Sequence, residues 1–237
     1  MLKIFHKGFN EGQDGPGNRL VFHTQGCNFR CPWCANPESI DPNRPAKSYT
    51  EDELVDLIQE CKPLFYDGGG VTFTGGEPTL QFDDLKSLFE RLKKLGINTA
   101  IETNGSCKRL PELFSVLDHL MIDLKHCNIE KHKGVVLHGN EVTKQNIIAA
   151  SEKNIDTIVR IPMINGLNTD KQSCKEFVAF FKSLNVKVEL LKYHEYGKVK
   201  WESLGLEYKI KDGYVKDEDY DYFVKTFKEN GINLIKT

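Results

Sequence analysis

The sequence predicts an α/β fold with a parallel sheet, built as a partial, open (β/α)6 TIM-like barrel. Short apolar runs alternate with longer amphipathic runs along most of the chain, and strand-then-helix repetition builds a parallel sheet with right-handed crossovers. Polar residues or glycines also follow the C-terminal ends of most predicted strands, and a barrel's active site is built at these ends. A doubly wound open sheet is the alternative that the same alternation allows.

The elements are expected in a regular order after a glycine-rich loop at residues 8–19. The apolar and β-branched runs predict strands at residues 19–25, 70–74, 97–103, 119–124, 157–161 and 187–191. Apolar residues at helical spacing predict helices at residues 54–58, after a capped start at 48–53, and at 82–95, 109–116, 140–153, 170–183 and 217–229.

The composition is that of a soluble globular protein, and we expect one domain over residues 1–237. The hydrophobic content is 39%, the charged content is 28% and the net charge is -2, which gives no support for a nucleic-acid-binding or polybasic surface. No apolar run approaches the ~20 residues of a membrane-spanning helix, and the N-terminus lacks the apolar core of a signal peptide. We therefore expect a cytoplasmic protein, and a monomer.

Three cysteines, Cys27, Cys31 and Cys34, lie close together directly after the first predicted strand. Thiolates at this spacing in a reduced chain are more typical of metal binding than of disulfides. An iron–sulfur cube needs four ligands, so three cysteines leave one iron open for a ligand from outside the protein. A zinc knuckle completed by His23 is the alternative, but His23 belongs to a predicted strand rather than to a tight turn. The other cysteines are solitary and are expected to be buried apolar residues: Cys61, Cys107, Cys127 and Cys174.

Several polar residues at the other strand ends are weak signals when each is taken alone. Gly75 and Gly76, followed by Glu77, could let a ligand lie against the backbone or could simply form a turn. Asp123 and Lys125 share one face of an extended chain, as a ligand-binding pair or a solvated charge pair would. The remaining candidates are single residues with structural alternatives of their own: Glu102, Thr103, Arg160 and His194.

Taken together, these motifs resemble those of radical SAM enzymes, which hold a [4Fe-4S] cluster with three cysteines and bind S-adenosylmethionine at the fourth iron. Cys27, Cys31 and Cys34 match the cluster loop, Trp33 the aromatic residue before the third cysteine, and residues 75–77 the methionine-binding motif. The loop at residues 14–19 and the stretch at 190–201 are similar to those of glycyl-radical-enzyme activating enzymes, especially pyruvate formate-lyase activating enzymes. The matches span residues 14–209.

The resemblance implies a function and a set of roles. A flavodoxin or ferredoxin would reduce the cluster, S-adenosylmethionine would be cleaved to a 5′-deoxyadenosyl radical, and this radical would take a hydrogen from a glycine of a partner enzyme. Asp14 would contact that partner. By this resemblance, the residues that bind the cofactor are Trp33, Gly75, Gly76, Glu77, Glu102, Asp123, Lys125, Arg160 and His194. The residues that would bind a monovalent cation are Glu102, Thr103, Met121 and Asp123. A radical SAM enzyme acting on a small molecule or peptide is the alternative.

Overall fold

The computed structural model describes residues 1–236, and the chain divides into two compact units. The first unit consists of Met1–Asn28, Ser39–Thr103 and Cys107–Met121. The second consists of Phe29–Glu38, Asn104–Ser106 and the chain from Ile122 onward. The single domain expected from the sequence stays a prediction.

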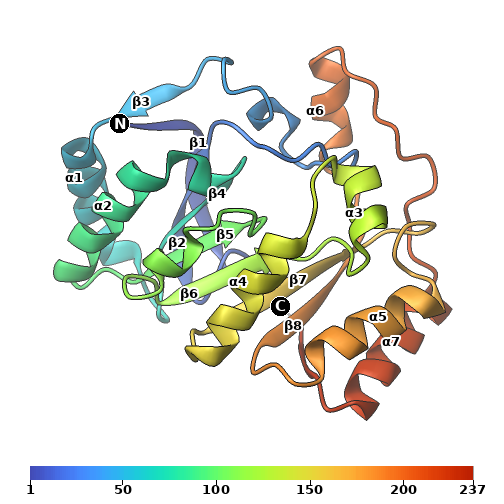
Figure 1. Cartoon of the computed structure of the whole chain (residues 1–237). Coiled ribbons are helices and arrows are strands. Elements are labelled where there is room, and N and C mark those ends of the chain that lie inside the picture. Colours follow the sequence, from blue (N-terminus) through green and yellow to red (C-terminus); the bar gives the residue numbers. More distant parts are fainter. Residues whose placement is uncertain (237) are drawn as a thin grey trace. The chain divides into compact units, whose positions relative to one another are not determined.

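The first unit is built on a mixed sheet whose strands lie in the order β3-β1-β2-β4-β5 (Figure 1). β1 pairs antiparallel with both β2 and β3, whereas β2, β4 and β5 run parallel to one another. Tight pairing aligns Thr24 at the end of β2 with Gly75 at the end of β4. The bounds are Leu2–Glu11 for β1, Asn18–Thr24 for β2, Lys47–Tyr49 for β3, Gly70–Gly75 for β4 and Thr99–Thr103 for β5.

Two helices of the first unit, α1 (Glu51–Cys61) and α2 (Phe82–Lys94), cover one face of this sheet. α2 buries apolar side chains at helical spacing, and its Phe89 packs edge-on against Phe73 of β4 with ring centroids 5.4 Å apart. Thr72 and Thr74 therefore point to the opposite face of the sheet, because side chains alternate along a strand. Short 3-10 helices complete the unit: η1 (Pro37–Ser39) leads into it, followed by η2 (Lys62–Leu64), η3 (Pro78–Gln81) and η4 (Leu110–Leu113).

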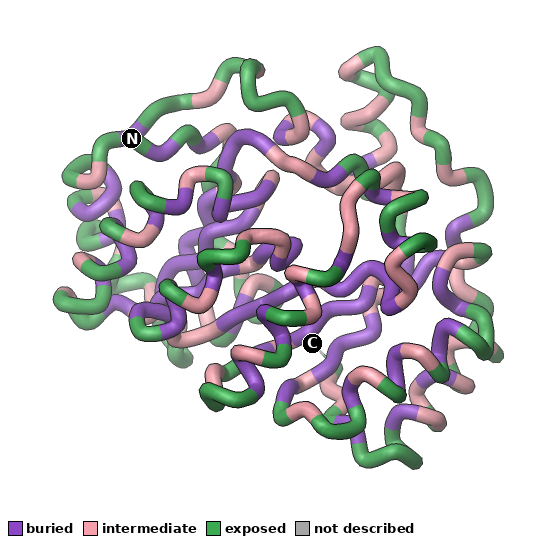
Figure 2. The backbone as a smooth tube through the Cα atoms, viewed as in Figure 1, coloured by how far each residue is buried: buried purple, intermediate pink, exposed green. Residues whose placement is uncertain are grey.

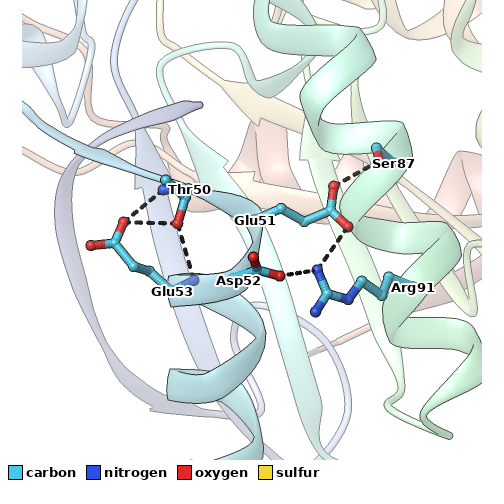
Figure 3. Close-up of polar contacts among 6 residues, drawn as sticks. All are labelled: Thr50, Glu51, Asp52, Glu53, Ser87 and Arg91. Atoms are coloured by element: carbon cyan, nitrogen blue, oxygen red, sulfur yellow. Dashed lines mark hydrogen bonds and ion pairs between the residues drawn. The ribbon is translucent and has the colours of Figure 1, made fainter.

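The start of α1 confirms the capped helix expected from the sequence (Figure 3). The Thr50 hydroxyl accepts a hydrogen bond from the Glu53 backbone N–H, and the Glu53 carboxylate accepts from the Thr50 N–H at 2.7 Å. Such a capping box contributes about 1 kcal/mol to helix stability. Arg91 of α2 donates to Glu51 and Asp52 across the surface, an exposed contact that adds little to stability because water screens it.

The second unit contains the parallel strands β7 (Thr157–Met163), β8 (Lys187–Lys192) and β9 (Asn233–Ile235). The strand β6 (His119–Asp123) begins in the first unit and ends in the second. α5 and α7 pack against each other through phenylalanines, among them Phe181 and Phe227, whose tilted rings have centroids 6.4 Å apart. β7 and the middle of β8 are largely buried (Figure 2), whereas β9 is partly exposed. The helices are α3 (Ile129–Val136), α4 (Glu141–Glu152), α5 (Lys171–Phe181), α6 (Lys198–Ser203) and α7 (Asp217–Glu229).

Most predicted elements are present, and the differences have local causes. Residues 8–11 belong to β1 rather than to the glycine-rich loop, because their backbone pairs with β2 even though their side chains are largely exposed. The predicted helix at residues 109–116 is only the 3-10 helix η4, which has Pro111 near its start. The sequence did not predict β1, β3, β9, α3 or α6.

None of the helices within residues 1–236 combines the length and the apolar character that a bilayer-spanning segment requires.

Candidate active site

In the first unit, the backbone of the Gly75–Glu77 motif is hydrogen-bonded to residues 24–26, which directly precede the first cysteine. The Gly76 N–H donates to the Thr24 carbonyl at 2.9 Å, and the Glu77 N–H donates to the Gly26 carbonyl at 2.7 Å. A Cβ on Gly76 would lie 2.0 Å from the Gly26 carbonyl oxygen, and one on Gly75 would lie 2.5 Å from the Thr24 nitrogen. The sequence left open whether these glycines let a ligand lie against the backbone or form a turn. On the side where a Cβ would stand, the space is filled by the end of β2 and the residues that follow.

The Glu77 side chain is fully buried and joins two segments of the first unit. Its carboxylate accepts hydrogen bonds from the Thr79 backbone N–H at 3.0 Å and from the Thr103 hydroxyl at 2.7 Å. Beside it, the Glu102 carboxylate accepts from the Thr74 hydroxyl at 2.7 Å. Glu102 and Thr74 thus meet on the face of the sheet opposite α2. The structure brings the predicted residues Glu77, Glu102 and Thr103 to neighbouring strand ends.

Asp14 lies in the loop between β1 and β2, which is folded onto that same face. The Thr72 hydroxyl donates to the Asp14 carbonyl oxygen at 2.6 Å, and the Asn10 side-chain amide donates to the Asp14 carboxylate. Thr72 precedes Thr74 by two residues, which is about 7 Å along a strand. Asp14 is therefore held on the side of the sheet that presents Thr74, although its loop comes before β2 rather than after it.

The buried side chain of Arg19 fixes this loop against β4. Arg19 was not predicted as a site residue. Its guanidinium is fully buried and donates to the Thr72 hydroxyl at 2.7 Å, to the Val71 carbonyl at 2.6 Å and to the Asn98 side chain at 2.9 Å. Burial lowers the pKa of Arg19 to about 10, while Asp118 and Asp14 oppose this shift. The guanidinium remains protonated at neutral pH and fixes the loop that carries Asp14.

In the second unit, the thiols of Cys31 and Cys34 interact electrostatically with the buried ammonium of Lys125. Burial raises the pKa of the Cys31 thiol to about 12, and the Lys125 ammonium is the largest influence that lowers it. Burial alone would lower the pKa of Lys125, but Asp123 and then Cys31 raise it above its ordinary value. The Lys125 ammonium lies 2.5 Å from the Asp123 carboxylate. The donor set fits an iron–sulfur group, because cysteine sulfur is the ligand that such groups take.

Buried amide side chains hold the backbone around Lys125. The Asn168 amide, fully buried, donates to the Lys125 carbonyl at 2.9 Å and to the Pro162 carbonyl at 2.8 Å. The Asn140 amide donates to the His126 carbonyl at 2.7 Å. On α4, Thr143 and Asn146 hold Asn104 and Gly105 in the same way, through bonds of 2.9 and 2.8 Å. These residues were missed, because an asparagine in a sequence does not show which distant carbonyl it binds.

Arg160 and His194 are placed differently from what the sequence suggested. Arg160 was expected at the end of its strand, but β7 continues to Met163, so it lies in mid-strand and is 6% exposed. Its guanidinium donates to the buried Glu189 carboxylate of β8 at 2.9 Å, a partner that was not predicted. His194 follows β8 and is exposed, with its ring stacked on Tyr196 at 4.2 Å between centroids.

Comparisons with known proteins show which family the chain belongs to. The sequence profile of the Radical SAM superfamily matches residues 21–178. The chain belongs to the radical SAM superfamily. It is 35% identical over 217 residues to a pyruvate formate-lyase-activating enzyme of Staphylococcus epidermidis, covering 87% of this chain and 86% of that protein. A radical SAM enzyme with this degree of similarity is a relative of the activating enzymes.

Solved structures show the same fold. A domain of a pyruvate formate-lyase-activating enzyme from Bacteroides vulgatus superposes with a TM-score of 0.59 and 26% identity, over 71% of this chain and 98% of that chain. SuiB of Streptococcus suis, solved with S-adenosylmethionine, superposes with a TM-score of 0.69 and 17% identity, over 90% of this chain and 48% of that chain. The α/β fold of an open, mostly parallel radical SAM partial barrel is thereby confirmed.

Proposed function

We propose that this radical SAM enzyme is a glycyl-radical-enzyme activase whose partner resembles pyruvate formate-lyase. The Lys125 ammonium, held buried beside Asp123 and the thiols of Cys31 and Cys34, is the observation that carries the proposal. In a chain similar over most of its length to pyruvate formate-lyase-activating enzymes, this is where a cluster and its cosubstrate belong. When bound, the [4Fe-4S] cluster supplies the electron that cleaves S-adenosylmethionine to the radical that abstracts hydrogen from a partner's glycine.

The chain's own residues have distinct tasks under this proposal. Cys27, Cys31 and Cys34 hold the cluster. Asp123 and Lys125 orient the charged end of S-adenosylmethionine, since opposite charges with little access to water attract more strongly than exposed ones. Trp33, Gly75, Gly76, Glu77, Arg160 and His194 complete the cofactor contacts. Asp14 positions the partner.

A monovalent cation beside the cofactor's carboxylate is a further part of the proposal. Glu102 and Thr103 supply oxygen ligands of the kind that such a cation prefers, and the main chain of Met121 and the Asp123 carboxylate are the other proposed donors. Because Glu102 already accepts from Thr74 and Thr103 donates to Glu77, the cation would compete with an existing hydrogen-bond network. We further propose a flavodoxin or ferredoxin donor and a monomer in the cytoplasm, where thiols stay reduced.

Replacing Asp123 by alanine is expected to weaken S-adenosylmethionine binding about tenfold to a hundredfold. A lost charge-assisted hydrogen bond costs about 1.5–3 kcal/mol, which corresponds to that range. The measurement is anaerobic calorimetry with cluster-loaded protein, whose iron content should stay unchanged. Asp156→Ala is the matched control, because Asp156 pairs with Lys187 at an exposed position of the second unit. An unaltered affinity in Asp123→Ala would remove this residue from the cofactor site.

Replacing Asp14 by alanine tests the activase proposal against a small-molecule enzyme. We expect normal cleavage of S-adenosylmethionine without a partner but about a hundredfold less glycyl radical on a pyruvate formate-lyase-type partner, because small misplacements of a target cost that much. The readout is the ratio of glycyl radical, counted by electron paramagnetic resonance, to 5′-deoxyadenosine released. Asp84→Ala, at an exposed ion pair of the same unit, serves as the control. If wild type forms no radical on any such partner, the small-molecule alternative replaces this proposal.

A further inference from the structure

The segment that carries the second and third cysteines, residues 29–38, is held by two helices of the second unit. Here it is called the cysteine segment. Near its start, the Arg30 N–H donates to the Val136 carbonyl at the end of α3 at 3.0 Å. The buried Phe29 ring lies against His132 and His138, with centroids 5.5 and 5.1 Å away. These contacts bind one end of the segment to α3 and to the turn after it.

The other end of the cysteine segment is bound by α6, a helix of six residues far away in the sequence. The Trp201 indole N–H donates to the Cys34 carbonyl oxygen at 2.8 Å. The Lys200 ammonium donates to the Asn36 side chain at 2.9 Å and lies 2.8 Å from the Glu38 carboxylate. α6 therefore contacts the segment at Cys34, Asn36 and Glu38.

Close backbone packing accompanies these polar contacts. A Cβ on Gly197, the residue before α6, would lie 2.4 Å from the Cys34 carbonyl oxygen and 2.8 Å from the Ala35 Cα. Only a residue without a side chain lets α6 come this near. The Cys34 carbonyl thus has the indole donor and the Gly197 backbone beside it, both from the same short element.

We propose that α6 is a clamp that holds the cysteine segment in its ligand-presenting shape before any metal is bound, with Trp201 and Lys200 as positioning residues. The proposal rests on the function proposed above only in taking Cys31 and Cys34 as cluster ligands. Every contact of the clamp joins protein atoms, so the clamp can be tested in the metal-free protein. Keeping ligands near their final places lowers the conformational entropy that binding must otherwise overcome.

The test is amide hydrogen exchange of the metal-free protein, followed in peptides that cover residues 29–38. Trp201→Phe keeps an aromatic ring but removes the indole donor, and should speed exchange in these peptides about threefold to tenfold, the effect of one net hydrogen bond. Lys200→Met should speed it about twofold to fivefold, since its ion pair is partly exposed. Lys198→Met is the matched control and should change nothing there, because Lys198 pairs with Glu195 near α6 itself.

Peptides from α2, in the first unit, are the internal reference and should exchange at the wild-type rate in all variants. Unchanged exchange of residues 29–38 in Trp201→Phe would overturn the clamp, and so would acceleration spread equally over α2, which would mean general destabilisation. After cluster loading, Trp201→Phe should release iron to a chelator several-fold faster than wild type and Lys198→Met. If the exchange result holds but wild-type protein binds no iron–sulfur cluster, the clamp stands and the proposed function fails.

Discussion

Replacing Cys31 by alanine is expected to remove the iron–sulfur cluster and with it all cleavage of S-adenosylmethionine. Under the proposed function, three cysteine thiolates are the protein's whole contribution to the cluster, so losing one would leave a second iron without a protein ligand. The remaining cysteines are not expected to offer a substitute. Cys127 and Cys174 are buried in the second unit, and Cys174 is fixed within α5.

The measurement is iron and sulfide content, with the electron paramagnetic resonance signal of the reduced protein, after anaerobic reconstitution. Cys61→Ala is the control, because Cys61 ends α1 in the first unit and is expected to have no part in the cluster. Wild-type iron in Cys31→Ala would show that this cysteine is not a ligand. Loss of iron in Cys61→Ala would instead show that the ligand set has been assigned wrongly.

The elements that could be predicted from the sequence are those specified by neighbouring residues. The start of α1 is an example, because Thr50 and Glu53 bind each other's backbone across three positions. α7, at Asp217–Glu229, has the bounds that its helical spacing predicts. β1 was missed entirely, although its first residues alternate between buried and exposed. Its second half pairs at the surface and lacks the buried alternation that reveals a strand.

The candidate site divides in the same way. Residues with motif spacing, such as Gly76 and Lys125, could be singled out because the spacing itself belongs to a family. Their partners could not, because Asn168, Glu189 and Trp201 act through contacts that join positions 29 to 167 residues apart in the chain. Polarity alone does not distinguish a buried asparagine that holds a strand end from one exposed on the surface.

The roles of Gly75 and Gly76 could not be predicted from the sequence without the structure. A Gly-Gly pair after a strand is compatible with a turn, a ligand-binding loop or close backbone packing. These alternatives differ in which atoms a Cβ added to the glycine would meet. Around Gly76 the neighbours are backbone atoms of the Thr24–Gly26 stretch. The motif therefore packs against the residues that directly precede Cys27, in addition to any contact that it makes with the cofactor.

Replacing Gly76 by alanine is accordingly expected to destabilise the metal-free protein by about 2–5 kcal/mol. The new Cβ would lie 2.0 Å from the Gly26 carbonyl oxygen, which belongs to the backbone and cannot rotate away. Overpacking of this kind costs about 1–3 kcal/mol, and each of the hydrogen bonds from Gly76 and Glu77 that is lost adds about 0.5–1.5 kcal/mol.

Urea unfolding of Gly76→Ala and Gly134→Ala is the decisive comparison. Gly134 lies within α3, and a Cβ there would meet no atom within 4 Å, so alanine should stabilise that helix by about 0.5–1 kcal/mol. Because Gly26 directly precedes Cys27, Gly76→Ala should also fail to take up a full complement of iron, whereas Gly134→Ala should load normally. Wild-type stability and iron content in Gly76→Ala would mean that the motif and the cysteine loop do not approach each other as closely as described. A stable Gly76→Ala that fails only to bind S-adenosylmethionine would instead assign the glycine to the ligand-binding loop that the sequence left open.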